Sequence, residues 1–164
     1  MAVDTSIIGR ETGRARVQVE RAPLANFAKA VQDDNAVYSD VNAAEAAGFD
    51  GTPAPPTFGF ALEFWGRYPE LQKGLTPVQG NPMMEVIGKL MQNGGLILHG
   101  EQEFEYHRPI VAGDVLRSEG KVVDAYEKES KGKTMTFIVV ETVWRDEKDR
   151  KPVVTERFNL IHRS

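Results

Sequence analysis

The sequence predicts an α+β fold in which an antiparallel sheet covers a buried helix. The predicted helices all lie within residues 1–95, together with one short strand, whereas four long strand patterns fill most of the remainder. Such segregation of helices and strands along the chain is typical of α+β proteins. One predicted helix, residues 58–67, is apolar around nearly its whole circumference. A helix of that kind must be buried on most sides, and an antiparallel sheet has one face to cover.

Length and composition narrow the class of protein. The chain has 164 residues, and its 20 basic and 24 acidic side chains leave a net charge of −4. We therefore expect a single domain over residues 1–164. No basic stripe is present, which argues against nucleic acid as a partner. The absence of cysteine excludes disulfides, thiolate nucleophiles and cysteine metal ligands.

The sequence also bears on the cellular compartment and on whether a metal or a cofactor is expected. The first fourteen residues lack the apolar run of a signal peptide, and no segment reaches the length of a membrane span. We therefore expect a cytoplasmic protein with no membrane partner. The three histidines are too scattered for a metal site, and no nucleotide fingerprint is present. No metal or cofactor is expected.

The first elements are a strand and a helix. Residues 14–20 alternate between apolar and polar side chains, which predicts a short strand. Pro23 suits the first turn of a helix, which we expect to end near Gln32–Asp33, where residues that favour turns begin. Apolar side chains recur along this helix at the spacing of one face: Leu24, Phe27, Ala28 and Val31.

A dense polar cluster, residues 33–40, follows this helix and leads to a second one. Residues 40–47 are predicted to form a short helix with Asp40 as its N-cap and Gly48 as its C-cap. Such a cluster beyond a helix end can place several polar groups at the mouth of a pocket. Capping and turn formation are the alternative role for Asp33, Asp34 and Asn35.

The predicted central helix is preceded by residues 51–57, which contain too much proline for regular structure. Thr57 is expected to cap the helix over residues 58–67. A loop over residues 68–81 then leads to another helix, residues 83–92.

The four predicted strands are separated by turn-like segments. Their ranges are 96–106, 115–126, 134–144 and 153–162. Because the connections are short, we expect neighbours in sequence to be antiparallel neighbours in the sheet. A curved sheet of this kind wrapped around a buried helix is the hot-dog arrangement.

Several stretches share the order and spacing of a known family: Phe27-Ala28, Asp33, Asn35, Val37, Tyr38, Asp40, Ala54-Pro55-Pro56-Thr57-Phe58, Leu98-His99-Gly100-Glu101-Gln102 and Tyr106-His107-Arg108-Pro109-Ile110. Together they resemble the MaoC-like hot-dog dehydratases, in particular the FAS1-like, N-terminal-type domain. Such domains occur in two-domain hydratases and in subunits of mycolic-acid-type 3-hydroxyacyl dehydratases. The resemblance covers roughly residues 6–162.

The resemblance implies catalytic residues. In active members the signature reads G-D-x-N-P, an aliphatic residue, His, any residue and an acid. Asp33 matches the catalytic acid, Asn35 matches the Asn, and Tyr38 stands where the catalytic His is expected. In active members an Asp–His pair activates water, which adds to an enoyl thioester to give an (R)-3-hydroxyacyl thioester, or the reverse. A tyrosine titrates at about pH 10, so Tyr38 is a poor base.

The resemblance also implies residues that bind the acyl thioester. Four of them open the central helix, where free backbone N–H groups can bond the thioester carbonyl: Pro56, Thr57, Phe58 and Gly59. His99 is a further candidate, and Arg108 can hold a phosphate of coenzyme A or of an acyl-carrier arm. The expected ligand is therefore an acyl-CoA or acyl-carrier-protein thioester.

The leading prediction is a catalytically reduced, acyl-binding subunit of a hydro-lyase. Domains of the N-terminal type often carry the replacement seen at Tyr38, and they resemble partners that shape the acyl tunnel while another MaoC-like domain supplies the Asp–His pair. Because a hot-dog sheet leaves free edges, we expect either a homodimer or a heterodimer with a catalytic MaoC-like subunit.

Three alternatives remain open. The first is a self-sufficient hydratase that uses Asp33 and Asn35, with Tyr38 or His99 in place of the usual histidine. The second is a hot-dog thioesterase with Glu63 as base or nucleophile, although an exposed or ion-paired Glu63 is the simpler expectation. The third is a non-enzymatic acyl-binding protein.

Overall fold

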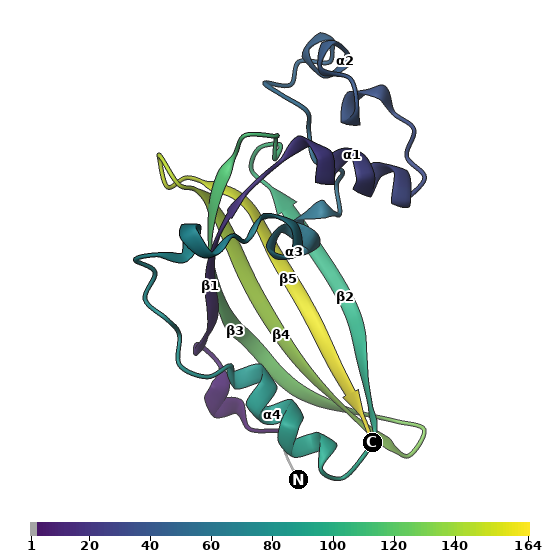
Figure 1. Ribbon diagram of the computed structural model, residues 1–164. Coiled ribbons are helices and arrows are strands. Elements are labelled where there is room, and N and C mark those ends of the chain that lie inside the picture. The colour runs from purple at the N-terminus through teal and green to yellow at the C-terminus, as the bar shows by residue number, and fades with distance from the viewer. Residues whose placement is uncertain (1–2) are drawn as a thin grey trace.

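The computed structural model describes residues 3–164 (Figure 1). Met1 and Ala2, which begin the stretch predicted to lack a signal peptide, lie outside the described residues. Within residues 3–164, helices and one curved antiparallel sheet form a mixed α+β fold, as predicted. The sheet has five strands in the order β1-β3-β4-β5-β2.

The strands agree closely with the predicted ranges. Their bounds are β1 Glu11–Gln18, β2 Leu96–Tyr106, β3 Val115–Ser130, β4 Lys133–Asp146 and β5 Pro152–Arg163. The prediction is confirmed because alternation and turn residues, which are local signals, set the length of each strand.

The sheet order differs from the prediction at β2. Strands β3, β4 and β5 are consecutive antiparallel neighbours, but β2 pairs with β5, so that Phe104 lies opposite Glu156. The expectation that β2 pairs with the next strand in sequence is therefore wrong. The reason is that β1 occupies the free side of β3, and residues 107–114 carry the chain across the sheet to β3.

The helical elements are short. They are α1 Arg21–Ala30, α2 Val41–Ala46, α3 Leu62–Gly66 and α4 Pro82–Met91, with single 3-10 turns η1 Thr5–Ile7, η2 Ala36–Tyr38, η3 Phe58–Ala61 and η4 Pro69–Gln72. The caps predicted for α2 are present: Asp40 Oδ1 accepts a bond of 2.8 Å from the N–H of Asn42, and Gly48 follows with φ 87°. A carboxylate before the first turn and a glycine with positive φ just past the last one are the residue types that these two positions favour.

The predicted buried helix over residues 58–67 is broken and only partly buried. It consists of η3 and α3, and Thr57 makes no side-chain cap bond to it, so the capping prediction for Thr57 is wrong. Three aromatic side chains of this segment stay accessible: Phe60 at 46%, Phe64 at 78% and Trp65 at 52%. The ring of Phe60 packs against His99 and Phe158 of the sheet. The described chain leaves most of Phe64 and Trp65 uncovered, so the all-round apolar pattern is not fully buried.

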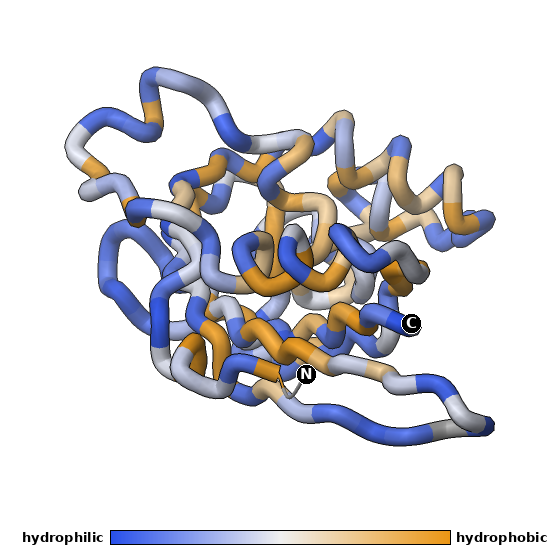
Figure 2. Tube along the Cα trace, turned by 90° about the horizontal axis from the view of Figure 1, so that it is seen from below, coloured by the Kyte–Doolittle hydropathy of each residue, from blue (hydrophilic) through white to orange (hydrophobic). Residues whose placement is uncertain are grey.

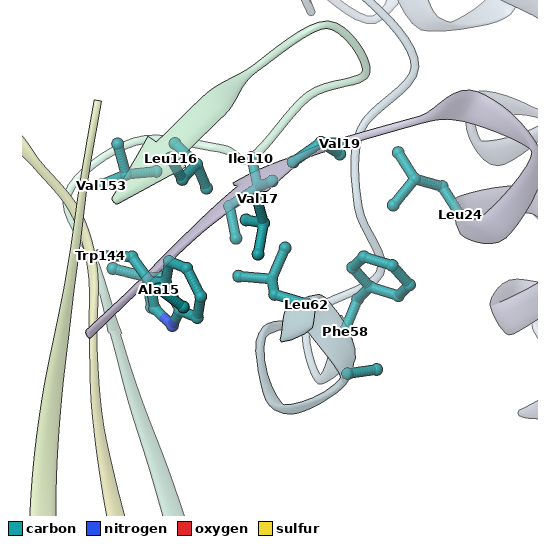
Figure 3. Close-up of a cluster of buried hydrophobic side chains, with 12 residues drawn as sticks. Ala15, Val17, Val19, Leu24, Phe58, Leu62, Ile110, Leu116, Trp144 and Val153 are labelled. Atoms are coloured by element: carbon teal, nitrogen blue, oxygen red, sulfur yellow. The ribbon is translucent and has the colours of Figure 1, made fainter. Parts of the chain in front are cut away.

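Two hydrophobic clusters hold the molecule together. The first joins η3 and α3 to β1 and α1, and in Figure 3 Phe58 and Leu62 point into it toward Leu24 and Val17. The rings of Phe27 and Phe58 meet edge to face at 5.3 Å. The second cluster lies under α4, at the other end of the sheet. Figure 2 shows the apolar segments gathered toward the middle of the molecule and hydrophilic ones along the outer loops.

Candidate functional site

The polar cluster after α1 forms a series of local caps. Asp33 Oδ1 accepts a bond of 3.0 Å from the N–H of Asn35, and Asn35 Oδ1 accepts one of 3.2 Å from the N–H of Val37. These bonds turn the chain through η2 toward α2, which confirms the turn-forming interpretation of the cluster. A catalytic role for Asp33 and Asn35 stays a prediction.

Tyr38 connects this cluster to a larger cavity. It lines a small cavity of about 100 Å³ together with Asp33 and Asn35, and it also lines a neighbouring pocket of about 440 Å³. Burial raises the pKa of Tyr38, and the negative charge of Asp33 raises it further. Tyr38 is therefore protonated at neutral pH, where its hydroxyl can donate a hydrogen bond but cannot accept a proton as a base.

The larger cavity, here called the Tyr38 pocket, lies beside the crossing segment 107–114. Its walls are largely apolar: Tyr38, Phe49, Pro53, Ala54, Pro56, Tyr106, His107, Arg108, Pro109 and Ile110. Backbone bonds hold the two walls together, from Ala54 N to Ile110 O and from Ala112 N to Thr52 O, each 2.8 Å long. A mainly apolar cavity of this size with a few polar groups is typical of small-molecule sites.

The structure brings some of the predicted binding residues to this pocket and leaves others out. Pro56 and Arg108 line it, whereas Thr57 is exposed and Phe58 is buried in the core. His99 lies elsewhere, with its ring 5.2 Å from that of Phe60 and 4.6 Å from that of Phe158.

His107 and Tyr106 belong to the pocket, although sequence reasoning did not select them. His107 Nε2 lies 3.1 Å from Thr155 Oγ1, and the Tyr106 hydroxyl donates to the carbonyl of Pro56. Burial raises the pKa of Tyr106, and the nearby charge of Glu156 adds to this effect. Their one sequence signal was the family-like run Tyr106–Ile110, and their place depends on how the chain crosses to β3.

Arg108 already has two anionic partners. Its Nη1 lies 2.8 Å from Asp114 Oδ2, and its Nη2 lies 2.7 Å from Asp146 Oδ2. The hydrogen bond with Asp114, followed by the charges of both carboxylates, raises the pKa of Arg108. These ion pairs fasten the crossing segment to the end of β4, and a role of Arg108 toward phosphate stays a prediction.

A second cavity of about 400 Å³, here called the Glu156 pocket, lies between the η3–α3 segment and the sheet. Its walls are Gly59, Phe60, Glu63, Phe64, Arg67, Thr142, Trp144 and Glu156. Glu156 is only 7% exposed, and burial raises its pKa to about 7; the Trp144 side chain lowers this value and the charge of Glu63 raises it. Glu156 was missed although it shares the buried face of β5 with Val154 and Phe158.

Glu63 sits on the rim of this second cavity and is exposed. Its Oε2 lies 2.9 Å from Arg67 Nη1, which confirms the expectation of an exposed, ion-paired carboxylate. Among residues 3–164, no three His, Asp or Glu side chains gather as a metal site requires. Within the same residues, no helix combines the length and the apolar character needed to cross a membrane.

Sequence relatives identify a family. The model of the "FAS1-like, dehydratase domain region" matches residues 6–156. A UPF0336 protein of Saccharopolyspora erythraea is 30% identical over 164 residues, covering 99% of this chain and 93% of that protein. Another, from Streptomyces avermitilis, is 37% identical over 117 residues, covering 71% of this chain and 69% of that protein.

Solved structures share the fold at lower identity. The ChsH1–ChsH2 complex of Mycobacterium tuberculosis aligns with a TM-score of 0.71 at 22% identity, covering 92% of this chain and 83% of that one. The HadBC (3R)-hydroxyacyl-ACP dehydratase complex from the same organism gives 0.65 at 21%, covering 93% and 96%. A MaoC-like dehydratase from Rhodospirillum rubrum gives 0.60 at 18%, covering 94% and 91%. The chain therefore belongs to the FAS1-like dehydratase-region family and has the hot-dog fold of the MaoC-like dehydratases.

Proposed function

We propose that this chain is the acyl-thioester-binding subunit of an (R)-specific enoyl-thioester hydratase, which in reverse is a 3-hydroxyacyl-thioester dehydratase. The Tyr38 pocket carries the proposal. It is apolar, it has the volume of a small-molecule site, and a protonated tyrosine occupies the position at which active members hold a histidine base.

The reaction needs two proton transfers. In the hydration direction, a base removes a proton from water as the oxygen adds to the β-carbon, and an acid delivers a proton to the α-carbon. Tyr38 cannot supply the base, and the Asp33 carboxylate is already an acceptor for the turn it forms. We therefore assign the Asp–His pair to a second MaoC-like subunit, and this chain shapes the acyl site.

Two features of the surface support a partner. Strand β2 lies at the end of the strand order, so one side of its backbone is free to pair with another chain. The exposed rings of Phe64 and Trp65 lie on the uncovered face of α3. Two of the similar structures, ChsH1–ChsH2 and HadBC, are complexes of two different subunits. A catalytic MaoC-like chain is accordingly the proposed partner, as a heterodimer in preference to a homodimer.

The decisive experiment assays hydration of a trans-2-enoyl-CoA by the purified chain, alone and with the MaoC-like chain encoded beside it. We expect activity only from the pair, loss of activity when the partner's catalytic histidine is replaced, and little change in kcat for Asp33→Asn in this chain. Robust activity of the isolated chain that disappears in Asp33→Asn would overturn the proposal.

A self-sufficient hydratase is the second candidate, and one observation favours it. His107 lines the Tyr38 pocket and its Nε2 lies 3.1 Å from Thr155 Oγ1, so the pocket holds an oriented imidazole as a candidate general base. In this case the isolated chain hydrates enoyl-CoA and His107→Gln abolishes the activity. His99→Gln is the matched control, because His99 packs between Phe60 and Phe158 instead.

The remaining alternatives have their own outcomes in the same assay. Thioester cleavage that is lost in Glu63→Gln would identify a thioesterase, for which the exposed Glu63–Arg67 ion pair offers no support. Binding of acyl-CoA without turnover in any pairing would identify an acyl-binding protein.

A further inference from the structure

The Glu156 pocket contains a carboxyl group that the proposed reaction does not use. Glu156 projects from β5 toward the η3–α3 segment and is almost fully buried. Among the described residues, its Oε1 atom has no hydrogen-bond partner. A buried polar atom without a hydrogen-bond partner destabilises a fold, so the presence of this carboxyl group requires an explanation.

The backbone opposite Glu156 leaves room for this carboxyl. A Cβ atom on Gly59 would lie 2.3 Å from Glu156 Oε1 and 3.1 Å from Phe104 Cε1. Any side chain at position 59 would therefore push the carboxyl out of its place. The pair of Gly59 and Glu156 thus builds one wall of the cavity, and the orphaned atom belongs to that wall.

The other walls define the chemistry of an occupant. Phe60, Phe64 and Trp144 supply aromatic surface, and Thr142 adds a hydroxyl. The cation on the rim, Arg67, is neutralised by Glu63 at 2.9 Å. An anionic ligand would meet two carboxylates, whereas an apolar ligand with one neutral oxygen would satisfy both the aromatic surface and the carboxyl.

We propose that the Glu156 pocket is a subsite for a hydroxyl or carbonyl oxygen on an otherwise apolar ligand, and that Glu156 makes the protein select acyl chains bearing such an oxygen over plain alkyl chains. The identification of the ligand as an acyl chain rests on the proposed function. The subsite itself rests on the cavity, the orphaned carboxyl oxygen and the space that Gly59 leaves.

The protonation of Glu156 determines which oxygen it binds. Because its pKa is about 7, the carboxyl donates to a ketone below neutrality and can only accept, as from an alcohol, above it. The charged or titratable groups that face it are Glu63 and Arg67 of the α3 segment and Tyr106 of β2. Burial raises the pKa of Tyr106, so its hydroxyl stays protonated around pH 7.

Trp144 provides a direct signal for occupancy. The chain has two tryptophans, so the Trp65→Phe variant leaves Trp144, in the wall of the pocket, as the sole tryptophan, whose fluorescence can be excited selectively over that of the tyrosines. Titrating this variant with 2-octanone, 1-octanol and octanoate compares a ketone, an alcohol and an anion of matched length. We expect both neutral probes to change the Trp144 emission and octanoate to bind more weakly.

The pH dependence tests the carboxyl itself. Affinity for 2-octanone should fall by nearly tenfold between pH 6 and pH 8, following the loss of the proton, whereas that for 1-octanol should change little. In Glu156→Gln the ketone affinity should no longer depend on pH, and in Glu156→Leu both affinities should fall by roughly fivefold. Glu63→Gln, the same change on the exposed rim, should keep a pH-dependent affinity for the ketone, with its midpoint moved to lower pH because the charge of Glu63 raises the pKa of Glu156.

The outcomes separate this inference from the proposed function. Absence of any response of Trp144 to the neutral probes, or an unchanged pH dependence in Glu156→Gln, overturns the subsite even if enoyl-CoA is hydrated by the paired chains. A response to the probes without binding of any acyl thioester overturns the proposed function and leaves the subsite standing. Because a glutamine side chain has nearly the shape of glutamate, the Glu156→Gln variant decides the test even where the Leu variant fails to fold.

Discussion

Two adjacent residues of β5 show that the face to which a side chain points determines its ion pairing and its ionisation. Arg157 points to the outer face, where its guanidinium lies 3.1 Å from Glu141 and 3.3 Å from Glu103. Glu156, one residue earlier, points to the inner face and is buried, and within residues 3–164 its Oε1 has no hydrogen-bond partner. Because successive side chains of a strand alternate between faces, a single step along the chain separates a solvated ion pair from a carboxyl whose pKa is raised to about 7.

Replacing Glu156 by glutamine is expected to change how stability depends on pH. The folded state raises the pKa of this acid from 4.5 to about 7, so the folded protein holds the proton more tightly than the unfolded chain. This tighter proton binding adds on the order of 3 kcal/mol to the free energy of unfolding below pH 4.5, and the added stability is lost as pH rises through 7. Urea denaturation at pH 5 and pH 8 should show Glu156→Gln gaining stability over wild type at the higher pH.

The exposed Glu63→Gln variant serves as the control for that measurement. It removes a carboxylate from the same cavity but from its accessible rim. The charge of Glu63 is a smaller cause of the raised pKa of Glu156 than burial is, so the stability of this variant relative to wild type should depend on pH much less than that of Glu156→Gln. If the stability of the two variants depended on pH in the same way, burial of Glu156 would not be the cause of that dependence.

A second prediction at this scale concerns Arg108 and the carrier of the acyl group. If Arg108 binds a phosphate of coenzyme A, Arg108→Gln should weaken binding of an acyl-CoA by roughly fivefold while leaving the acyl-pantetheine thioester unaffected. Calorimetric titration of both ligands makes the comparison. The Asp146→Asn variant, which loosens the 2.7 Å ion pair but keeps the guanidinium, is the matched control. Equal losses for both thioesters would assign Arg108 a structural role alone.

At the scale of elements, the η3–α3 segment has a different form from the continuous helix that its apolar pattern predicts. A 3-10 turn and a five-residue helix replace it. The segment packs closely on β1, where a Cβ atom added to Gly66 would lie 2.5 Å from the carbonyl oxygen of Gln18 and 3.1 Å from Cβ of Val17. The absence of a side chain at position 66 therefore lets this element approach the sheet.

Two glycine substitutions test that close approach. Gly66→Ala should destabilise the fold by about 1–3 kcal/mol, since the obstructing atom is backbone and cannot rotate away. Gly88→Ala, in the exposed part of α4 with no atom within 4 Å of the added Cβ, should instead stabilise by about 0.5–1 kcal/mol through helix propensity. Thermal unfolding of both variants measures the two changes in stability. Equal destabilisation by the two substitutions would contradict the close approach at Gly66.

At the scale of the whole molecule, the sheet leaves β2 at an edge and the aromatic face of α3 uncovered. Figure 1 shows α3 in front of the sheet near β5 and β2, while α1 and α2 extend beyond one end. An exposed apolar face beside a free strand edge is a typical association surface. The proposed partner would cover both features.

Association should therefore depend on Phe64, whose side chain is the most exposed of the large apolar ones noted above. Phe64→Asp should weaken dimerisation with the MaoC-like partner by at least tenfold, with little effect on the stability of the isolated chain. Light scattering of mixtures and denaturation of the chain alone measure the two effects. Met84→Asp, a similar change at an exposed position on α4, is the control. An unchanged dimer in Phe64→Asp would place the interface elsewhere.

Several parts of the candidate site could be recognised before the structure. Tyr38, Pro56 and Arg108 were selected from the sequence, and all three line one pocket. His99 was selected as well but lies against Phe158 instead, because the pairing of β2 with β5 sets its surroundings. His107 was passed over, since its neighbours Arg108 and Pro109 marked only the end of a strand.

The sequence by itself determined the class of fold, the extents of the long strands and the caps of α2. Alternation, turn residues and capping side chains act over a few neighbouring residues, so they can be read without knowing the rest of the chain. Only the tertiary structure decided that β2 pairs with β5, that the central helix is broken, and that Glu156 lies against Gly59. These outcomes depend on contacts between residues far apart in sequence, where burial of side chains selects one strand pairing from several with the same local pattern.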